Sequence, residues 1–254
     1  MTGETENLAG RTAIVTGGTR GIGRAIVARL VAAGAQVVTC GRNEPADLDP
    51  TVTFVAADVR DPDQCVALVE QAVSATGRLD ILVNNAGGSP QADAATASPR
   101  FFDAILKLNL GSAMYLSQAA YAPMKAAGGG SVVNIASVSG IRPSPGTAAY
   151  GAAKAGLLNL TQSLAQEWGP DAIRVNAIIA GLMATEAAEQ TYGDEAAQAA
   201  VARSLPLRRM GSGEDIANAV AWLCSDQASW VSGARLNVDG GGERPYFLDL
   251  VKGG

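Results

Sequence analysis

Residues 11–33 read RTAIVTGGTRGIGRAIVARLVAA, which joins an apolar run, a glycine-rich loop and an amphipathic segment. The run 11–16 predicts a short buried strand. Residues 20–33 repeat apolar side chains at helical spacing, which predicts a helix ended by Gly34. Glycines between a strand and a helix permit a tight turn and let backbone approach a pyrophosphate, and the helix N-terminus offers that anion amide donors. This stretch therefore predicts a dinucleotide-binding loop, with a ligand-free glycine turn as the alternative.

The rest of the chain alternates short apolar runs with longer amphipathic segments. The expected strands are 11–16, 36–40, 51–57, 79–83, 131–136, 173–179 and 234–238. The expected helices are 20–33, 62–76, 99–127, 148–168 and 214–224, with a mobile helical flap within 185–203. Apolar strands that alternate with helices are typical of a parallel sheet covered on both faces.

The fold class expected is α/β, with a doubly wound, seven-stranded parallel sheet flanked by helices. Residues 1–254 show no linker, so we expect one domain. It would comprise an N-terminal segment at 1–10, a substrate-loop flap at about 182–210 and a C-terminal tail at 243–254.

The composition argues against several functions. The net charge is -5 without a long basic run, so nucleic acid is not expected as a partner, since phosphate binding needs clustered Lys and Arg. No apolar run reaches the roughly 18 residues of a membrane-spanning helix. Residues 1–7 resemble neither a secretory signal nor a transit peptide. Cys40, Cys65 and Cys224 are widely spaced, which indicates reduced thiols in a cytoplasmic protein and no zinc site.

The chain contains no histidine. This excludes Ser-His-Asp hydrolysis, His-assisted Cys catalysis and the common zinc-hydrolase sites. A general acid must then be Tyr, Lys, Asp, Glu or Cys.

Tyr150 and Lys154 lie four residues apart, and so on one face of the helix expected at 148–168. A Lys cation at roughly 4 Å, with an effective dielectric of about 20, would favour the phenolate by about 4 kcal/mol and lower the pKa of Tyr150. Ser137 follows the expected strand 131–136. The alternative is a buried tyrosine beside a solvated lysine. With no histidine and no metal pattern, these three residues are the constellation suited to proton transfer on an oxygen.

The end of the second expected strand selects between two dinucleotides. An acidic residue there would bind a ribose 2′-hydroxyl, whereas an Arg would accept a 2′-phosphate. The chain has Cys40-Gly41-Arg42, without a carboxylate before Glu44, and Arg20 of the glycine loop can reach the same pocket. Two guanidinium groups favour NADP(H), while NAD(H) stays possible if Arg42 is only a solvated loop residue.

Together these motifs resemble the short-chain dehydrogenase/reductase family, in the compact single-domain branch that includes 3-oxoacyl-carrier-protein reductases and alcohol or ketone oxidoreductases. The resemblance runs from Arg11 to Gly241. The family's TGxxxGxG pattern stands at 16–23, its NNAG motif at 84–87 and its YxxxK motif at 150–154. One departure is Ala180-Gly181, where the family usually has Pro-Gly, and we expect it to loosen that turn.

The resemblance implies a Rossmann fold and hydride transfer between a nicotinamide and a carbonyl or carbinol carbon. It makes Tyr150 the general acid for reduction and the base for oxidation, with Lys154 lowering the pKa of Tyr150 and holding the nicotinamide ribose. It makes Ser137 the partner of the substrate oxygen, with Ser139 a weaker candidate, and gives Asn109 a water that relays protons. The implied cofactor-binding residues are Gly17, Thr19, Arg20, Gly21, Ile22, Gly23, Arg42, Asp58, Val59, Asn85, Ala86, Gly87, Tyr150, Lys154, Gly181, Met183 and Thr185. No metal is implied.

The predicted function is NADP(H)-dependent interconversion of a secondary alcohol and a ketone, with a 3-oxoacyl thioester as an equal substrate candidate. Three alternatives stay open: an NAD(H)-dependent catabolic alcohol dehydrogenase, a non-catalytic dinucleotide sensor on the same fold, and a dehydratase or epimerase. The expected pocket wall is 182–206, 139–146 and the segment after Gly87. Arg208 and Arg209 would meet a carrier phosphate or be solvated.

A homo-oligomer is expected, a tetramer or dimer as is common in the family. Small residues crowd the start of the segment 148–168, which permits close approach of a second subunit or close packing within one. The tail carries Tyr246, Phe247, Leu248 and Leu250, and we expect it to pack on a neighbour or near the pocket mouth.

Overall fold

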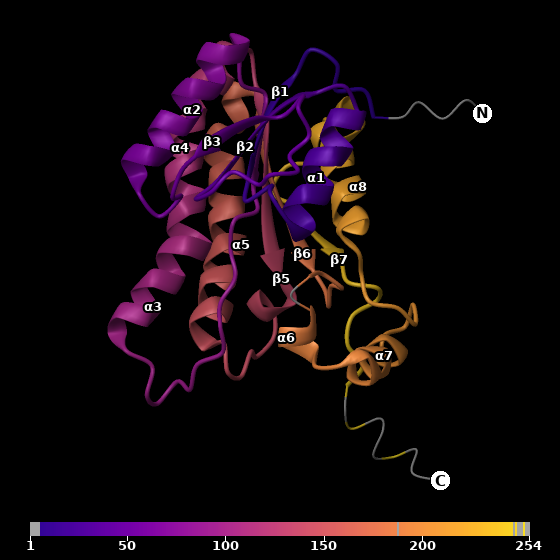
Figure 1. Ribbon diagram of the computed structural model, residues 1–254. Helices are drawn as coiled ribbons and strands as arrows, with labels where there is room; N and C mark the ends of the chain where they lie inside the picture. Colours follow the sequence, from indigo (N-terminus) through magenta and orange to yellow (C-terminus); the bar gives the residue numbers. More distant parts are fainter. Residues whose placement is uncertain (1–5, 187, 246, 248–250, 252–254) are drawn as a thin grey trace, which may run out of the picture.

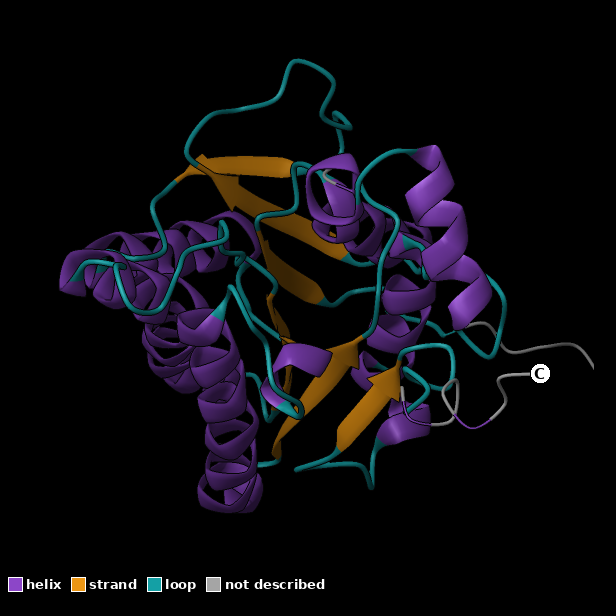
Figure 2. Ribbon diagram, turned by 90° about the horizontal axis from the view of Figure 1, so that it is seen from below, coloured by secondary structure: helices purple, strands orange, loops and turns teal. Residues whose placement is uncertain are grey.

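The computed structural model describes residues 6–186, 188–245, 247 and 251. Their centre is a seven-stranded sheet in the order β3-β2-β1-β4-β5-β6-β7, with every neighbouring pair parallel (Figures 1 and 2). The strands are β1 (Thr12–Thr16), β2 (Gln36–Gly41), β3 (Thr53–Ala56), β4 (Ile81–Asn84), β5 (Gly130–Ser137), β6 (Ile173–Ala180) and β7 (Arg235–Val238). The expected α/β class and strand number are confirmed.

Helices cover both faces of this sheet, as expected. The α-helices are α1 (Gly21–Ala32), α2 (Pro62–Thr76), α3 (Pro99–Leu106), α4 (Ser112–Ala126), α5 (Ala148–Trp168), α6 (Ala188–Tyr192), α7 (Glu195–Ser204) and α8 (Gly213–Cys224). Short 3-10 helices stand at Val138–Gly140, Gly169–Asp171 and Asp226–Ala228. Figure 1 shows α1 and α8 on one face, α2, α4 and α5 on the other, and α6 and α7 beyond the carboxyl ends of the strands. The flap therefore consists of two short helices.

The core explains why these segments form these layers. All five residues of β1 are buried, so the strand needs apolar contacts on both of its faces. On one side Ile26 and Leu30 of α1 pack in a cluster with Ile216 and Val220 of α8. The opposite cluster contains residues of α2 and α4. Burying each such Leu or Ile side chain contributes about 1.5–3 kcal/mol to the free energy of unfolding.

The expected helix 99–127 differs in one respect from the observed structure. It begins as expected, because the Ser98 hydroxyl accepts a hydrogen bond from the Phe101 amide at 3.2 Å and Pro99 follows the cap. A π-helical turn, Lys107–Gly111, then separates α3 from α4. Helix α4 continues past Pro123 to Ala126.

The sheet order places the switch point of the fold at the carboxyl ends of β1 and β4. The chain runs outward from β1 to β2 and β3, then returns to the other side of β1 with β4. The loops after β1 and β4 therefore diverge at neighbouring carboxyl ends, the place where open α/β sheets bind ligands. No helix in the described ranges has the length and hydrophobicity of a membrane-spanning segment.

Candidate active site

The glycine loop is fastened to the segment that follows β4. The Thr16 hydroxyl accepts hydrogen bonds from the amides of Asn85 and Ala86, each at 2.9 Å, and Asn85 Nδ2 donates to the Thr16 carbonyl at 2.8 Å. A Cβ atom added at Gly23 would lie 2.2 Å from the carbonyl oxygen of Gly17, so only glycine fits there. Gly17 has a φ of +64°, in the left-handed region. These contacts form a cradle of bare backbone at the switch point, which fits a dinucleotide.

The predicted 2′-phosphate residues lie at the rim of this cradle. Thr19 approaches Gly41, whose added Cβ would lie 3.5 Å from the Thr19 methyl group. Arg20 precedes α1, and Arg42 follows β2, and both side chains are exposed. Ile22, near the start of α1, is half-buried. The ends of β1 and β2 thus come together as the sequence predicts.

Asp58 has a closer partner than the sequence suggests. Its carboxylate accepts hydrogen bonds from Arg60 Nε at 2.9 and 3.1 Å, and its amide donates to Gln64 Oε1 at 2.8 Å. This pairing with Arg60, assisted by the charge of Arg42, lowers the pKa of Asp58 to about 2. Val59 is buried beside it. The carboxylate is therefore ionised at neutral pH, and Arg42 lies within its field.

The predicted catalytic side chains meet at the junction of β5 and α5. Ser137 is the last residue of β5, and its hydroxyl accepts a hydrogen bond from the amide of Ser139 at 3.2 Å. Lys154 Nζ lies 5.5 Å from the ring centre of Tyr150, one helical turn earlier. The Lys154 side chain is buried, and Nζ donates a hydrogen bond to a carbonyl of β5, that of Ile135, at 2.7 Å.

Burial dominates the pKa values of this group. Desolvation raises the pKa of Tyr150 above its usual value, the Ser137 hydroxyl opposes that rise, and the nearby phenol of Tyr192 adds to it. Desolvation lowers the pKa of Lys154 from 10.5 to about 8. The expected lowering of the Tyr150 pKa by Lys154 is not found in this structure, because the ammonium group faces Ile135 and burial favours the neutral phenol.

Asn109 lies inside the π-helical turn and is buried. Its Oδ1 accepts from the Gly88 amide at 2.8 Å, and its Nδ2 donates to the carbonyls of Gly88 and Ile105, each at 3.0 Å. A Cβ added at Gly87 would lie 2.7 Å from Asn109 Oδ1 and 3.3 Å from Lys154 Nζ. Gly87 thus stands between the two side chains, which the sequence separates by 45 positions. That Asn109 positions a water that relays protons stays a prediction.

Ser139 is engaged elsewhere. Its hydroxyl accepts a hydrogen bond from the Ser144 hydroxyl at 3.0 Å, and Ser144 pairs with the Thr147 hydroxyl at 2.6 Å. This chain of hydroxyls closes the loop before α5. Ser137 is therefore the better placed partner for an oxygen near Tyr150.

The turn after β6 keeps its contacts without the family's proline. The Gly181 amide donates to the Val238 carbonyl at 3.0 Å, and an added Cβ would lie 2.6 Å from the Cα of Asp239. The buried Met183 donates its amide to the Tyr192 hydroxyl at 3.3 Å. The loosening expected from Ala180-Gly181 stays a prediction, and Gly181 packs closely against Asp239 at the end of β7.

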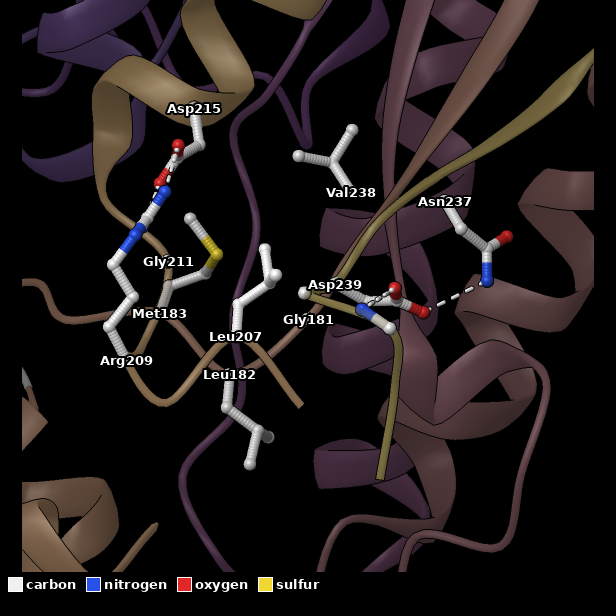
Figure 3. Close-up of a pocket in the computed structure, with 12 residues that line it drawn as sticks. Gly181, Leu182, Met183, Leu207, Arg209, Gly211, Asp215, Asn237, Val238 and Asp239 are labelled. Atoms are coloured by element: carbon white, nitrogen blue, oxygen red, sulfur yellow. Dashed lines mark hydrogen bonds and ion pairs between the residues drawn. The ribbon is translucent and has the colours of Figure 1, made fainter. Parts of the chain in front are cut away.

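A cavity of about 230 Å³ lies beside the carboxyl ends of β6 and β7. Figure 3 shows Met183 and Leu207 lining it between two polar pairs, Arg209 with Asp215 and Asn237 with Asp239. Its lining includes two predicted cofactor residues, Gly181 and Met183, but none of the four predicted catalytic residues. The cavity therefore adjoins the predicted catalytic group without containing it.

The two arginines offered for a carrier phosphate are differently placed. Arg209 forms hydrogen bonds of 2.6 and 2.8 Å with both carboxylate oxygens of Asp215. The Arg208 guanidinium bonds the carbonyl of Arg203. Both guanidinium groups already have partners within the protein, so a solvated or structural role describes Arg208 and Arg209 better than binding of a carrier phosphate.

Sequence reasoning did not single out four residues around the site. Arg142 and Glu243 form an ion pair, with a 2.6 Å contact, that joins the loop after β5 to the start of the tail. Tyr192 is the one aromatic residue of the flap 182–210, a signal that was available in the sequence. Glu186, which accepts a hydrogen bond from Gly21, gives no such signal because the two lie 165 positions apart.

The Arg142–Glu243 pair joins the first residue of the tail to the loop after β5, while the expected packing of the tail on a neighbour or near the pocket mouth stays a prediction. Phe247 is exposed. Tyr246, Leu248 and Leu250 lie outside the described residues.

Cysteine and metal chemistry lack support in the described part of the chain. Cys40, Cys65 and Cys224 are all buried without disulfides. Burial raises the pKa of Cys40 to about 11 and those of Cys65 and Cys224 to about 12. No group of three potential Cys, Asp or Glu ligands occurs among the residues described.

Comparison with known proteins agrees with this geometry. Residues 17–243 match a family model described as enoyl-(acyl carrier protein) reductase. The chain belongs to the short-chain dehydrogenase/reductase family. It is similar to a tropinone reductase homologue of Arabidopsis thaliana, 39% identical over 92% of this chain and 93% of the relative. It is equally similar to a 3alpha-hydroxysteroid dehydrogenase of Mediterraneibacter gnavus, 39% identical over 92% and 97% of the two chains.

Solved structures of short-chain dehydrogenases share the fold. The ligand-free aldohexose dehydrogenase of Thermoplasma acidophilum is 32% identical, with a TM-score of 0.87 over 92% of this chain and 94% of that one. The short-chain dehydrogenase/reductase described here is therefore an enzyme, an oxidoreductase that acts on CH–OH groups with a nicotinamide dinucleotide.

Proposed function

We propose that this enzyme interconverts a neutral ketone and its secondary alcohol with NADP(H), and that Tyr150 is the acid and base. The observation that carries the proposal is the convergence of Ser137, Tyr150 and Lys154 where β5 meets α5, with Asn109 reached through Gly87. With a pKa above the ordinary value of 10, the phenol is protonated at neutral pH and can donate a proton, and it is a weaker acid than an unperturbed tyrosine.

The residues take the following roles in reduction. Ser137 donates a hydrogen bond to the substrate oxygen, which stabilises the negative charge that develops there. Tyr150 donates its proton to the same oxygen. Lys154 holds the nicotinamide ribose hydroxyls, and Asn109 positions a water that returns a proton toward Tyr150. The bound dinucleotide supplies the hydride.

The cradle of bare backbone supports the dinucleotide assignment. Gly17, Gly21 and Gly23 line its β1 side, and Asn85 to Gly87 line its β4 side. Gly181, Met183 and Thr185 enter from β6, with the Thr185 methyl 4.0 Å from a Cβ added at Gly21. Asp58 and Val59 lie where the adenine is expected.

NADP(H) is favoured over NAD(H) by charge. Arg20 and Arg42 are exposed at the rim, and no ion pair within the described ranges involves either of them. Asp58 already has Arg60 as its partner. Two available guanidinium groups suit a 2′-phosphate, which they bind through charge-assisted hydrogen bonds.

The substrate class is proposed from the charges around Tyr150. Apart from Lys154, which is proposed to hold the nicotinamide ribose, the titratable group that acts on the pKa of Tyr150 is another phenol, that of Tyr192. Arg142 is neutralised by Glu243, and Arg209 by Asp215. A neutral alicyclic ketone suits this surrounding better than a carrier-bound thioester, whose phosphate would need an unpaired cation.

A ketone panel with each dinucleotide tests the proposal. The loss of NADPH absorbance should accompany reduction of neutral cyclic ketones, while NADH supports slower turnover at equal concentration. Binding of NADPH without turnover of any ketone, alcohol or 3-oxoacyl thioester would instead favour a dinucleotide sensor. Turnover that prefers NADH would leave the Tyr150 chemistry in place and remove the cofactor assignment.

We further propose one dinucleotide-binding domain in residues 1–254, assembled into a homo-oligomer. Ala149 and Ala153 of α5 are buried within the subunit, whereas Ala152 and Ala155 are exposed and leave a smooth surface for a second copy. Light scattering on the purified protein distinguishes monomer, dimer and tetramer. The cytoplasmic location stays a prediction.

A further inference from the structure

Helix α1 has no cap of its own. Arg20, at the N-cap position, makes no side-chain capping hydrogen bond, and the first turn holds no acidic residue. The acceptor comes from the flap instead, because Glu186 Oε1 accepts a hydrogen bond from the Gly21 amide at 3.2 Å. A Cβ added at Gly21 would lie 3.4 Å from Glu186 Oε2. A carboxylate of this chain therefore sits on the first amide of α1.

That position is the one a dinucleotide needs. The N-terminus of a helix attracts one anion through its free amides and its positive dipole end. A carboxylate and a pyrophosphate repel each other and compete for the same donors. Because the side chain of Glu186 is exposed, it can swing into solvent when a stronger anion arrives.

Nearby cations do not hold Glu186 in place. Arg24 is a basic side chain of α1 that interacts with Glu186, and its guanidinium pairs with Asp47, with an Nη2 to Oδ2 distance of 2.6 Å. Asp47 is the main cause of the raised pKa of Arg24, and Glu186 adds a smaller contribution. Glu186 thus feels the field of Arg24 without forming an ion pair with it.

The contact is connected to the flap and to the catalytic group. The Thr185 carbonyl accepts a hydrogen bond from the amide of Ala188, the first residue of α6, at 2.9 Å. The last residue of α6 is Tyr192, whose hydroxyl accepts from Met183 and whose phenol acts on the pKa of Tyr150. Glu186 thus lies between Thr185 and the start of the helix that carries Tyr192.

We infer that Glu186 is an internal competitor of the dinucleotide, which occupies the diphosphate position and must be displaced before the flap can settle over the bound cofactor. The inference rests on the proposed function, since it requires a dinucleotide in the cradle. Glu186 lowers cofactor affinity, and its departure couples cofactor binding to the position of α6.

Two variants of Glu186 test this competition. Glu186→Gln removes the charge, and Glu186→Ala removes the acceptor as well. Each should bind NADPH, and also ADP as a probe of the diphosphate alone, about two- to fivefold more tightly than the wild type by calorimetric titration. The matched controls are Glu189→Gln and Glu189→Ala, which remove the same charge from an exposed position of α6. The controls should leave both dissociation constants unchanged.

The outcomes separate the inference from the proposed function. Equal dissociation constants in wild type and both Glu186 variants would overturn the competitor role and leave the dinucleotide site standing. A lower melting temperature in the Glu186 variants without tighter binding would also overturn it, because the contact would then be only a helix cap. Absence of NADPH binding in wild type and variants alike would instead overturn the proposed function.

Discussion

Lys154 Nζ is hydrogen-bonded to the Ile135 carbonyl, at a distance of 2.7 Å. The bond joins α5 to the strand that ends at Ser137, and so fixes the ammonium group 5.5 Å from the Tyr150 ring centre. The same burial that orients Lys154 lowers its pKa to about 8. A positive charge is thus held in a place that disfavours it.

Lys154 should make stability depend on pH in a known direction. Its folded pKa lies below the ordinary 10.5, so between about pH 8 and about pH 10.5 the unfolded state binds more protons and stability rises with pH. We expect the free energy of unfolding of the wild type, relative to Lys154→Met, to increase by up to about 3 kcal/mol across that window. Urea denaturation of both proteins at several pH values measures it. A difference that stays constant with pH would contradict the assignment.

Tyr150→Phe should lower kcat by about 10²- to 10⁴-fold, because it removes the proposed proton donor while keeping the ring. The dissociation constant for NADPH should change little. Steady-state kinetics and calorimetry measure the two effects. Tyr115→Phe is the matched control, since Tyr115 lies on α4 and its loss of a hydroxyl should leave kcat unchanged. Similar activity in Tyr150→Phe and wild type would remove Tyr150 from the mechanism.

The two serines after β5 should behave differently. Ser137→Ala removes the proposed donor to the substrate oxygen and should lower kcat by about 10²- to 10³-fold. Ser139→Ala breaks the hydroxyl chain with Ser144 and should have a smaller effect. Comparison of kcat for the two variants decides between them. A larger loss in Ser139→Ala would exchange their roles.

Arg42→Ala should abolish the preference for NADPH. The exposed Arg42 follows the end of β2, where the 2′-phosphate is proposed to bind, so its loss should weaken NADPH binding and leave NADH binding nearly unchanged. Paired titrations with the two dinucleotides measure the ratio of dissociation constants. Arg100→Ala, on the exposed surface of α3, controls for the loss of one positive charge. A wild type that prefers NADH would refute the interpretation of Gly41-Arg42.

Gly87→Ala should disable the site without unfolding the protein. The new methyl group would approach Asn109 Oδ1 to 2.7 Å and Lys154 Nζ to 3.3 Å, so one or both side chains must move. We expect a large loss of kcat and a loss of about 1–3 kcal/mol in the free energy of unfolding. Gly169→Ala is the control, because nothing lies within 4 Å of its added Cβ and its φ is -52°. Full activity in Gly87→Ala would show that the close approach is relieved at no functional cost.

Local patterns predicted the fold and the elements that carry the candidate site residues. The helix expected at 148–168 is observed with those bounds, because its apolar periodicity and the following Gly169 both act over a few residues. The glycine loop and the segment 84–87 were both predicted to bind the dinucleotide, and Thr16 joins them. Such features depend on spacing along the chain, which the sequence displays.

Two features of the site depend on distance in space and were missed. The direction of the Tyr150 pKa shift follows from burial and from the bond that turns Lys154 toward Ile135, and spacing along α5 reveals neither. The contact of Glu186 with Gly21 joins the flap to the glycine loop, between segments that show no common pattern. The π-helical turn at 107–111 was also missed, for a local reason, because Lys-Leu-Asn-Leu-Gly suits an ordinary helix equally well.

The π-helical turn also sets a limit on length changes in this enzyme. A π-turn holds one residue more than an α-helix needs for the same advance. Deletion of one residue between Lys107 and Gly111 would let α3 run into α4 as a continuous α-helix, and would change the positions of the residues inside the turn, Asn109 among them. A one-residue gap at this place in an alignment with a relative would therefore mark a protein in which the side chain at the position of Asn109 is held differently.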